Sequence, residues 1–219
     1  MPGMAANCDI FENIKLDDSK YKLHFIEWFE PEKEESLQKY SERIALQITL
    51  ENPILIGVSF GGIIVQEIAK IIAVEKVIII SSVKDPSEFP VRIQWAKKWK
   101  LYRFFPTSYI NLIENVTKKI VSSKKIKIRI EMYKKYLTVR SKNYLDWAFE
   151  SIIEWENKNP VLNIVHIHGT KDHIFPHEKI KDAILLPNAT HVLVLLQYKW
   201  LNKNLPQLIL ENTYEKELD

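Results

Sequence analysis

The stretch GVSFGG, residues 57–62, places three of the chain's five glycines around one serine, Ser59. The apolar run Pro53–Ile56 precedes it, and the helix-length apolar segment Ile63–Ile72 follows it. A strand, a tight turn and a helix in this order form the setting in which a G-x-S-x-G serine stands exposed at the end of a strand. Small residues are needed two positions before and after such a serine, because strand and helix nearly touch there. The sequence therefore predicts a nucleophile elbow at Ser59.

Apolar segments on both sides of this turn predict an α/β fold. Continuous apolar strands that alternate with helices are typical of a parallel sheet covered by helices on both faces. Helices are expected over Glu35–Leu50 and Gly61–Ile72, where apolar residues recur at helical spacing. The expected strands are Lys22–Phe29, Ile54–Gly57, Val77–Ser81, Leu162–His168 and Ala183–Leu186.

The segment between Ser81 and Val161 shows no convincing parallel strand. Lys125–Ile130 alternates like a strand but also fits a helical stripe, and we favour a helix. No Gly/Ser-rich linker isolates the segment, so we expect one domain over residues 1–219 with a helical cap inserted at about 84–158. Aromatic residues recur at helical spacing in two parts of this cap: Trp95, Trp99, Tyr102 and Phe105, then Tyr144, Trp147 and Trp155.

Length and composition are those of a compact enzyme domain. The chain has 219 residues, of which 46% are hydrophobic, enough to bury a large core. Its apolar stretches are far shorter than the roughly 20 residues of a membrane span, and no secretory signal opens it. Its one cysteine, Cys8, excludes an internal disulfide. We expect a soluble, cytoplasmic protein.

Three further segments resemble parts of the α/β-hydrolase family, and with the turn at Ser59 the resemblance covers nearly the whole chain. Residues 167–176, which read IHGTKDHIFP, resemble the loop that carries that family's acid, at Asp172. Residues 190–192, which read THV, resemble its terminal histidine loop, at His191. The chain order of serine, acid and histidine is also the family's. Residues 2–4, which read PGM, resemble the His-Gly-x turn that supplies half of the oxyanion hole, with Pro2 in place of the usual histidine.

The resemblance implies a serine hydrolase that cleaves a carboxylic ester or thioester through an acyl-serine intermediate. His191 would take the proton of Ser59 and later protonate the leaving group, while Asp172 would orient the imidazole. Backbone N–H groups of Phe60 and Met4 would hold the oxyanion. No cofactor and no metal are implied. The expected partner is a small-molecule acyl ester or thioester, with no nucleic acid and no membrane span.

Several alternatives remain open. A chain that keeps this fold for binding or interaction alone, or an acyltransferase with the same triad, would carry the same motifs. The runner-up acid is Asp85, which follows the strand Val77–Ser81. Asp172, His173 and His177 could be imagined as metal ligands, but Pro176 argues against a regular helix through both histidines.

The start of the chain departs from the family pattern. Members have an apolar strand directly before the Pro-Gly or His-Gly turn, between the counterparts of Lys22–Phe29 and Ile54–Gly57, and Met1 stands where that strand would end. Either residues precede Met1 in the natural protein, or the start of the chain is misassigned, or the two neighbouring strands rearrange, because a central gap leaves backbone groups unpaired. We expect residues 2–4 near Ser59, with a gap or a compensating strand beside Ile54–Gly57.

Charge is unevenly distributed along the chain. Residues 84–142 hold 16 Lys and Arg against 4 acids, a net +12, so that the overall +3 leaves −9 for the remainder. A basic cap could attract anionic acyl substrates or an anionic membrane surface. The other interpretation, which we favour, is that these residues form the solvated polar faces of amphipathic helices.

Overall fold

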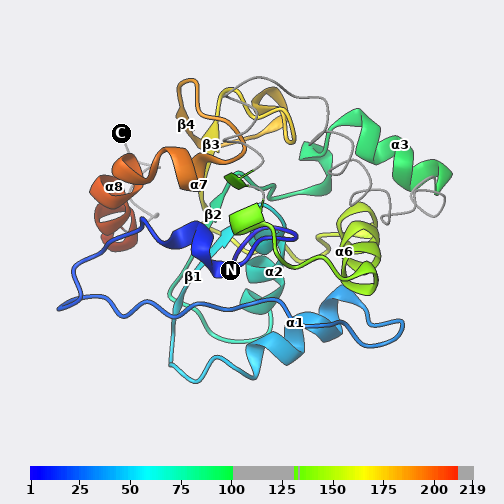
Figure 1. Ribbon diagram of the computed structural model, residues 1–219, viewed down its shortest axis with the longest axis horizontal. Coiled ribbons are helices and arrows are strands. Elements are labelled where there is room, and N and C mark those ends of the chain that lie inside the picture. The colour runs from blue at the N-terminus through cyan, green and yellow to red at the C-terminus, as the bar shows by residue number, and fades with distance from the viewer. Residues whose placement is uncertain (101–130, 133, 212–219) are drawn as a thin grey trace.

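The structure is a computed structural model that describes residues 1–100, 131–132 and 134–211 (Figure 1). Within the described residues, four strands form one parallel sheet in the order β1-β2-β3-β4. These strands are β1 (Ile54–Val58), β2 (Lys76–Ile80), β3 (Val165–Gly169) and β4 (Ile184–Leu186). Ile56 lies opposite Ile78, and Ile167 lies opposite both Ile80 and Ile184. The parallel sheet predicted from the apolar runs is confirmed.

Helices cover both faces of this sheet (Figure 1). On one face, α1 (Leu37–Ala45) and α2 (Phe60–Ala69) share a core cluster with Val77 and Ile79. On the other face, Ile78 and Ile80 pack with α7 (Leu193–Leu196) and α8 (Tyr198–Leu210). Adjacent residues of β2 therefore point into different cores, which explains why the strand is apolar throughout. None of the described helices is long and apolar enough to span a membrane.

Helices lie in the described part of the segment that the sequence assigns to a cap. They include α3 (Val91–Trp99) and α6 (Lys142–Glu154), which confirm a helix at Trp95 and Trp99 and another at Tyr144 and Trp147, whereas Trp155 follows the end of α6. Lys125–Ile130, together with Tyr102 and Phe105, lies outside the described residues. Short 3-10 segments complete the elements: η1 (Cys8–Phe11), η2 (Pro86–Glu88) and η4 (His177–Lys179).

The strand predicted at Lys22–Phe29 is wrong. Residues 21–32 contain neither strand nor helix. Their alternating pattern fits a half-buried strand, but their partners are side chains rather than a sheet edge. Trp28 is buried and stacks on Phe60, with ring centroids 5.2 Å apart, while Phe25 is 53% exposed. The segment is an extended strap, and its Trp28 side chain packs in the core.

The edge of β1 is paired with the backbone of Met1. The Met1 amino group donates to the Ile56 carbonyl at 2.8 Å, and the Val58 N–H donates to the Met1 carbonyl at 3.1 Å. From the sequence we expect either a gap or a compensating strand beside β1. No strand of the described residues fills it, and the two hydrogen bonds of Met1 satisfy backbone groups of β1 that would otherwise be unpaired.

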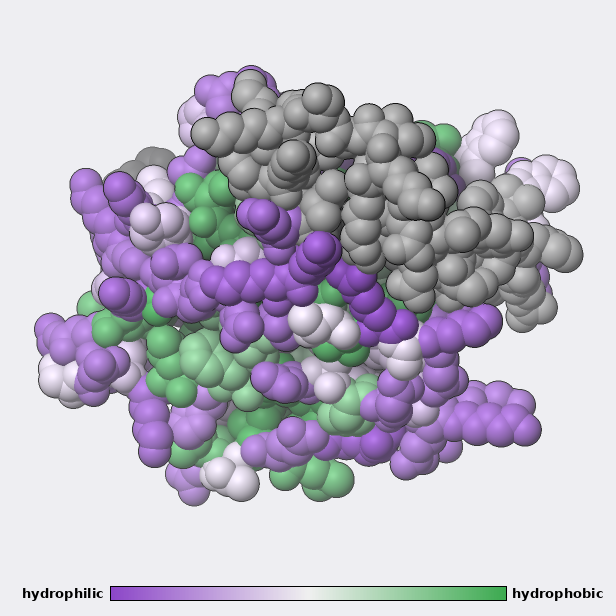
Figure 2. Space-filling view, in the orientation of Figure 1, coloured by the Kyte–Doolittle hydropathy of each residue, from purple (hydrophilic) through white to green (hydrophobic). Residues whose placement is uncertain are grey.

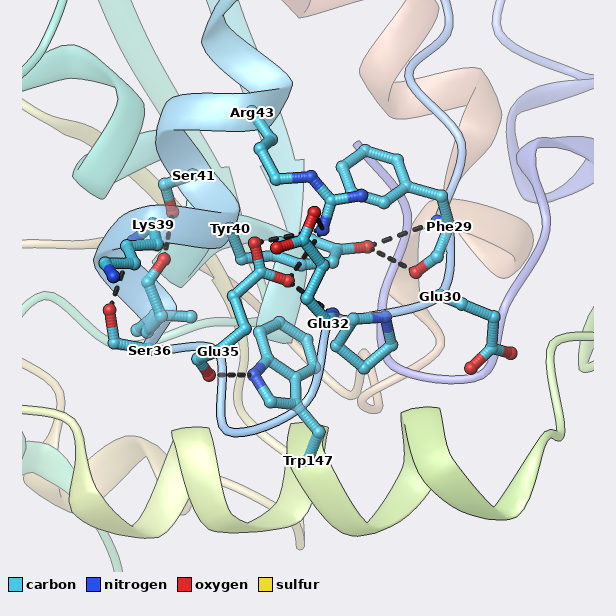
Figure 3. Close-up of polar contacts among 12 residues, drawn as sticks. Phe29, Glu30, Glu32, Glu35, Ser36, Lys39, Tyr40, Ser41, Arg43 and Trp147 are labelled. Carbon is cyan, nitrogen blue, oxygen red and sulfur yellow. Dashed lines mark hydrogen bonds and ion pairs between the residues drawn. The ribbon is translucent and has the colours of Figure 1, made fainter.

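A polar cluster fastens the end of the strap to α1 and α6 (Figure 3). Arg43 of α1 forms an ion pair with Glu35 at 2.7 Å, and the Glu35 side chain is only 2% exposed. The guanidinium also lies 4.5 Å from the centre of the Phe29 ring. Tyr40 donates its hydroxyl to the Phe29 carbonyl at 2.8 Å, and Trp147 of α6 donates its indole N–H to the Glu35 carbonyl at 2.8 Å. Residues 29–35 are therefore held from two sides.

Candidate active site

Ser59 lies where β1 ends and α2 begins. Its backbone has φ 52° and ψ −120°, a left-handed conformation that costs a non-glycine residue about 1–3 kcal/mol. Its N–H donates to the Ile80 carbonyl at 2.9 Å, and its carbonyl accepts from the Ser82 hydroxyl at 2.7 Å. At Gly57 an added Cβ would lie 2.3 Å from the Gly61 carbonyl oxygen, so this close approach admits only glycine. The turn at Ser59 is thus fixed by its neighbours.

His191 lies between Ser59 and Asp172. Its Nε2 is 3.0 Å from Ser59 Oγ, and its Nδ1 is 2.8 Å from Asp172 Oδ2. The ring of Phe175 packs against the imidazole, with ring centroids 5.5 Å apart and planes inclined by 72°. β1, β3 and β4 each end just before one of the three residues, so all three reach the same edge of the sheet.

Asp172 is held by the loop that follows β3. Its Oδ1 accepts from the backbone N–H groups of Ile174 and Phe175 at 2.8 and 3.0 Å, which leaves Oδ2 for His191. Burial by itself would raise the pKa of Asp172. The hydrogen bond from His191 and the backbone N–H of Phe175 favour the carboxylate and bring the pKa below its usual value. Asp172 is therefore a buried carboxylate that stays ionised.

The turn at residues 2–4 adjoins Ser59, as expected from the sequence. A Cβ on Gly3 would lie 3.3 Å from Ser59 Cβ, so the backbone passes directly beside the serine. Phe60 begins α2, and the first N–H groups of a helix have no partner within it. The backbone amides of Phe60 and Met4 therefore stay candidates for oxyanion donors.

Comparison with known proteins identifies the fold. No protein-family model matches the sequence, and a search of curated proteins finds no significant match. Solved structures do match. A carboxylesterase from the thaumarchaeon Nitrososphaera gargenis has a TM-score of 0.62 at 15% identity, over 95% of this chain and 88% of that one. A lipase-esterase related protein from Clostridium acetobutylicum has a TM-score of 0.60 at 18% identity, over 94% of this chain and 91% of that one. A thermophilic esterase from Thermogutta terrifontis has a TM-score of 0.59 at 11% identity, over 95% of this chain and 87% of that one.

The protein has the α/β-hydrolase fold. The sequence left two candidates, Asp172 and Asp85, for the acid that contacts the histidine, and the structure distinguishes between them. Asp172 contacts His191, whereas Asp85 accepts from the Ser87 N–H at 2.8 Å and caps η2. Across the described part of the chain, no group of three His, Cys, Asp or Glu side chains is arranged to hold a metal ion.

Two buried histidines of the α/β-hydrolase sheet, His166 and His168, lie behind the acid loop. The sequence did not predict their hydrogen bonds. His168 lies 2.9 Å by Nε2 from the Phe175 carbonyl, which can only accept, so this nitrogen carries the hydrogen. His168 Nδ1 then accepts from His166 Nε2 at 3.2 Å. Burial, as the largest cause, lowers the pKa of both histidines, so both stay neutral. The only sequence signal was their alternate placement in β3, which any buried strand shows.

Proposed function

We propose that the protein is a serine hydrolase that cleaves a carboxylic ester or thioester. The observation that carries this proposal is the continuous row from Ser59 Oγ through His191 to Asp172, with contacts of 3.0 and 2.8 Å. A nucleophile, a base and an orienting carboxylate in this order are what acyl transfer to serine requires. The likeness in fold to esterases supports the same reaction class.

In the proposed first step, Ser59 Oγ attacks the carbonyl carbon of the substrate while His191 Nε2 takes the hydroxyl proton. The N–H groups of Phe60 and Met4 stabilise the oxyanion that forms. When the bond to the leaving group breaks, His191 gives its proton to the alcohol or thiol. Water then attacks the acyl-serine by the same route, which releases the acid and restores Ser59. We also propose that residues 84–158, including α3 and α6, form a cap whose lining selects the acyl group.

The experiment that tests this proposal compares hydrolysis of p-nitrophenyl acyl esters by the wild type and by Ser59→Ala. The matched control is Ser81→Ala, because Ser81 directly follows the neighbouring strand β2, also has a left-handed φ of 50°, and is buried with no hydrogen-bond partner for its hydroxyl among the described residues. We expect Ser81→Ala to keep its activity and Ser59→Ala to lose at least about a thousandfold. A folded wild type with no activity on esters or thioesters would contradict the proposal and favour a binding protein.

A further inference from the structure

Trp28 contacts groups next to both proposed oxyanion donors: the Gly3 carbonyl, which shares a peptide with the Met4 N–H, and the side chain of Phe60. Its indole Nε1 donates to the Gly3 carbonyl at 2.9 Å in a buried hydrogen bond. Its ring stacks on the ring of Phe60, with centroids 5.2 Å apart and planes inclined by only 10°. Trp28 itself is 8% exposed and also packs against Tyr144 of α6. The Trp28 side chain thus contacts both the turn at residues 2–4 and Phe60, the two parts of the chain that carry the proposed oxyanion donors.

The hydrogen bond to Gly3 determines where the Met4 N–H points. Gly3 and Met4 share one planar trans peptide, in which the carbonyl and the N–H project in opposite directions. The Gly3 carbonyl also accepts from the Ala6 N–H at 3.0 Å, so both of its acceptor sites are occupied. With the carbonyl held by Trp28 and Ala6, the Met4 N–H faces the opposite side of the turn.

The rest of the turn is held from the cap side. The Ala5 N–H lies 3.4 Å from the Tyr144 hydroxyl, and the Ala5 carbonyl accepts from the Val139 N–H at 3.0 Å. Ala5 has φ 64°, the left-handed value that the third residue of a type II turn requires. These contacts fix the next peptide but leave the peptide between Gly3 and Met4 to Trp28 and Ala6.

We propose that Trp28 is a positioning residue of the oxyanion hole: its indole N–H locks the peptide between Gly3 and Met4 so that the Met4 N–H points to the carbonyl oxygen of the substrate. This inference rests on the proposed serine hydrolase function. Both acylation and deacylation pass through an oxyanion, so loss of the lock slows both steps. Binding of the ground-state ester is affected little, because the donors act on charge that develops in the transition state.

The test is the variant Trp28→Phe, which keeps an aromatic ring against Phe60 and removes the N–H donor. We expect kcat on a p-nitrophenyl ester to fall by about 10- to 100-fold, with KM changed less than about threefold. This is less than the loss of a whole donor, because the peptide still samples the productive orientation. A crystal structure of the variant should show the peptide between Gly3 and Met4 rotated, or in two orientations.

The matched control is Trp147→Phe. Trp147 also donates its indole N–H to a buried backbone carbonyl, at 2.8 Å, and belongs to the same aromatic cluster, but its acceptor is Glu35. A general loosening of the cluster would lower kcat equally in both variants and overturn the proposal. So would an unchanged peptide with unchanged kcat in Trp28→Phe. In either case an active wild type shows that the hydrolase function stands, whereas an inactive wild type contradicts the function and the positioning role together.

Discussion

At the scale of single residues, the site depends on how two atoms of one carboxylate are used. Asp172 Oδ1 holds two backbone N–H groups of its own loop, and Oδ2 accepts from His191 Nδ1. The first set of contacts places the carboxylate, and the second sets the tautomer of the imidazole. His191 Nε2 is then free of a proton and can accept the one on Ser59.

The variant Asp172→Asn separates these two roles. An asparagine oxygen can still accept from Ile174 and Phe175, but its NH₂ group would face His191 Nδ1 and impose the wrong tautomer. We expect kcat/KM to fall on the order of 10³- to 10⁴-fold at neutral pH, with a circular dichroism spectrum like that of the wild type. Retention of more than a tenth of the activity would show that another group orients His191.

The buried histidines predict a pH dependence of stability. Because folding lowers the pKa of His166 and His168, the unfolded chain binds more protons than the native one below the ordinary histidine pKa of about 6.5. Their contribution to stability is thus complete above that pH and is lost as the pH falls. We expect the free energy of unfolding in urea to decrease by up to about 1.4 kcal/mol per pH unit for each histidine below pH 6.5. His166→Gln should show a shallower decrease, and an equal slope in both proteins would refute this assignment.

At the scale of elements, the sequence predicted those strands and helices that a local pattern of apolar residues determines. β1 and β2 are mostly apolar, β3 alternates apolar residues with two histidines, and α2 follows the elbow, so each was recognisable without its partners. The strap at residues 21–32 has the same alternation as a strand, but its partners are the rings of the core and the Gly3 carbonyl, which no local pattern reveals. α8 was not predicted, and Pro206 lies within it, a residue that usually interrupts a helix.

The same limit holds for the site. Ser59, Asp172 and His191 could be proposed because each follows a predicted strand within a recognisable motif. Trp28 could not, because its role depends on the position of a backbone carbonyl 25 residues away in the chain.

The polar cluster that fastens the strap predicts a loss of stability when Arg43 is replaced. Arg43→Met leaves the Glu35 carboxylate buried without its cation. Removal of one partner of a buried pair is strongly destabilising, and because the Arg43 side chain is 34% exposed we expect a smaller loss of stability than for a fully buried pair. The double variant Glu35→Gln/Arg43→Met should recover part of this loss in urea unfolding, since no buried charge then remains. An additive loss in the double variant would contradict the explanation.

At the scale of the whole molecule, the described residues on the face in Figure 2 are largely hydrophilic, with groups of apolar side chains between them. Several cations of the basic segment 84–142 lie in ion pairs. Lys97 contacts Glu154 and Glu156, and Lys135 contacts Glu12. These pairs favour the interpretation of the basic residues as solvated helix faces rather than as a funnel for anionic substrates.

The salt dependence of the reaction tests that interpretation. Steering by a basic cap would make kcat/KM for an anionic acyl substrate fall as ionic strength rises past about 0.1 M, where the Debye length is near 10 Å. We expect the anionic substrate and a neutral ester of the same acyl group to respond alike, within about twofold. A selective fall for the anionic substrate would instead assign the +12 charge of residues 84–142 to substrate attraction.

The most direct measurement of the central claim is the position of the acyl group in the trapped intermediate. The wild type is mixed with a p-nitrophenyl ester, quenched in acid within the first turnover, digested and analysed by mass spectrometry. The proposed mechanism predicts an added acyl mass on the peptide that contains Ser59, absent in Ser59→Ala and strongly reduced in His191→Ala. An acyl group on any other residue, or ester turnover by Ser59→Ala at the wild-type rate, would contradict it.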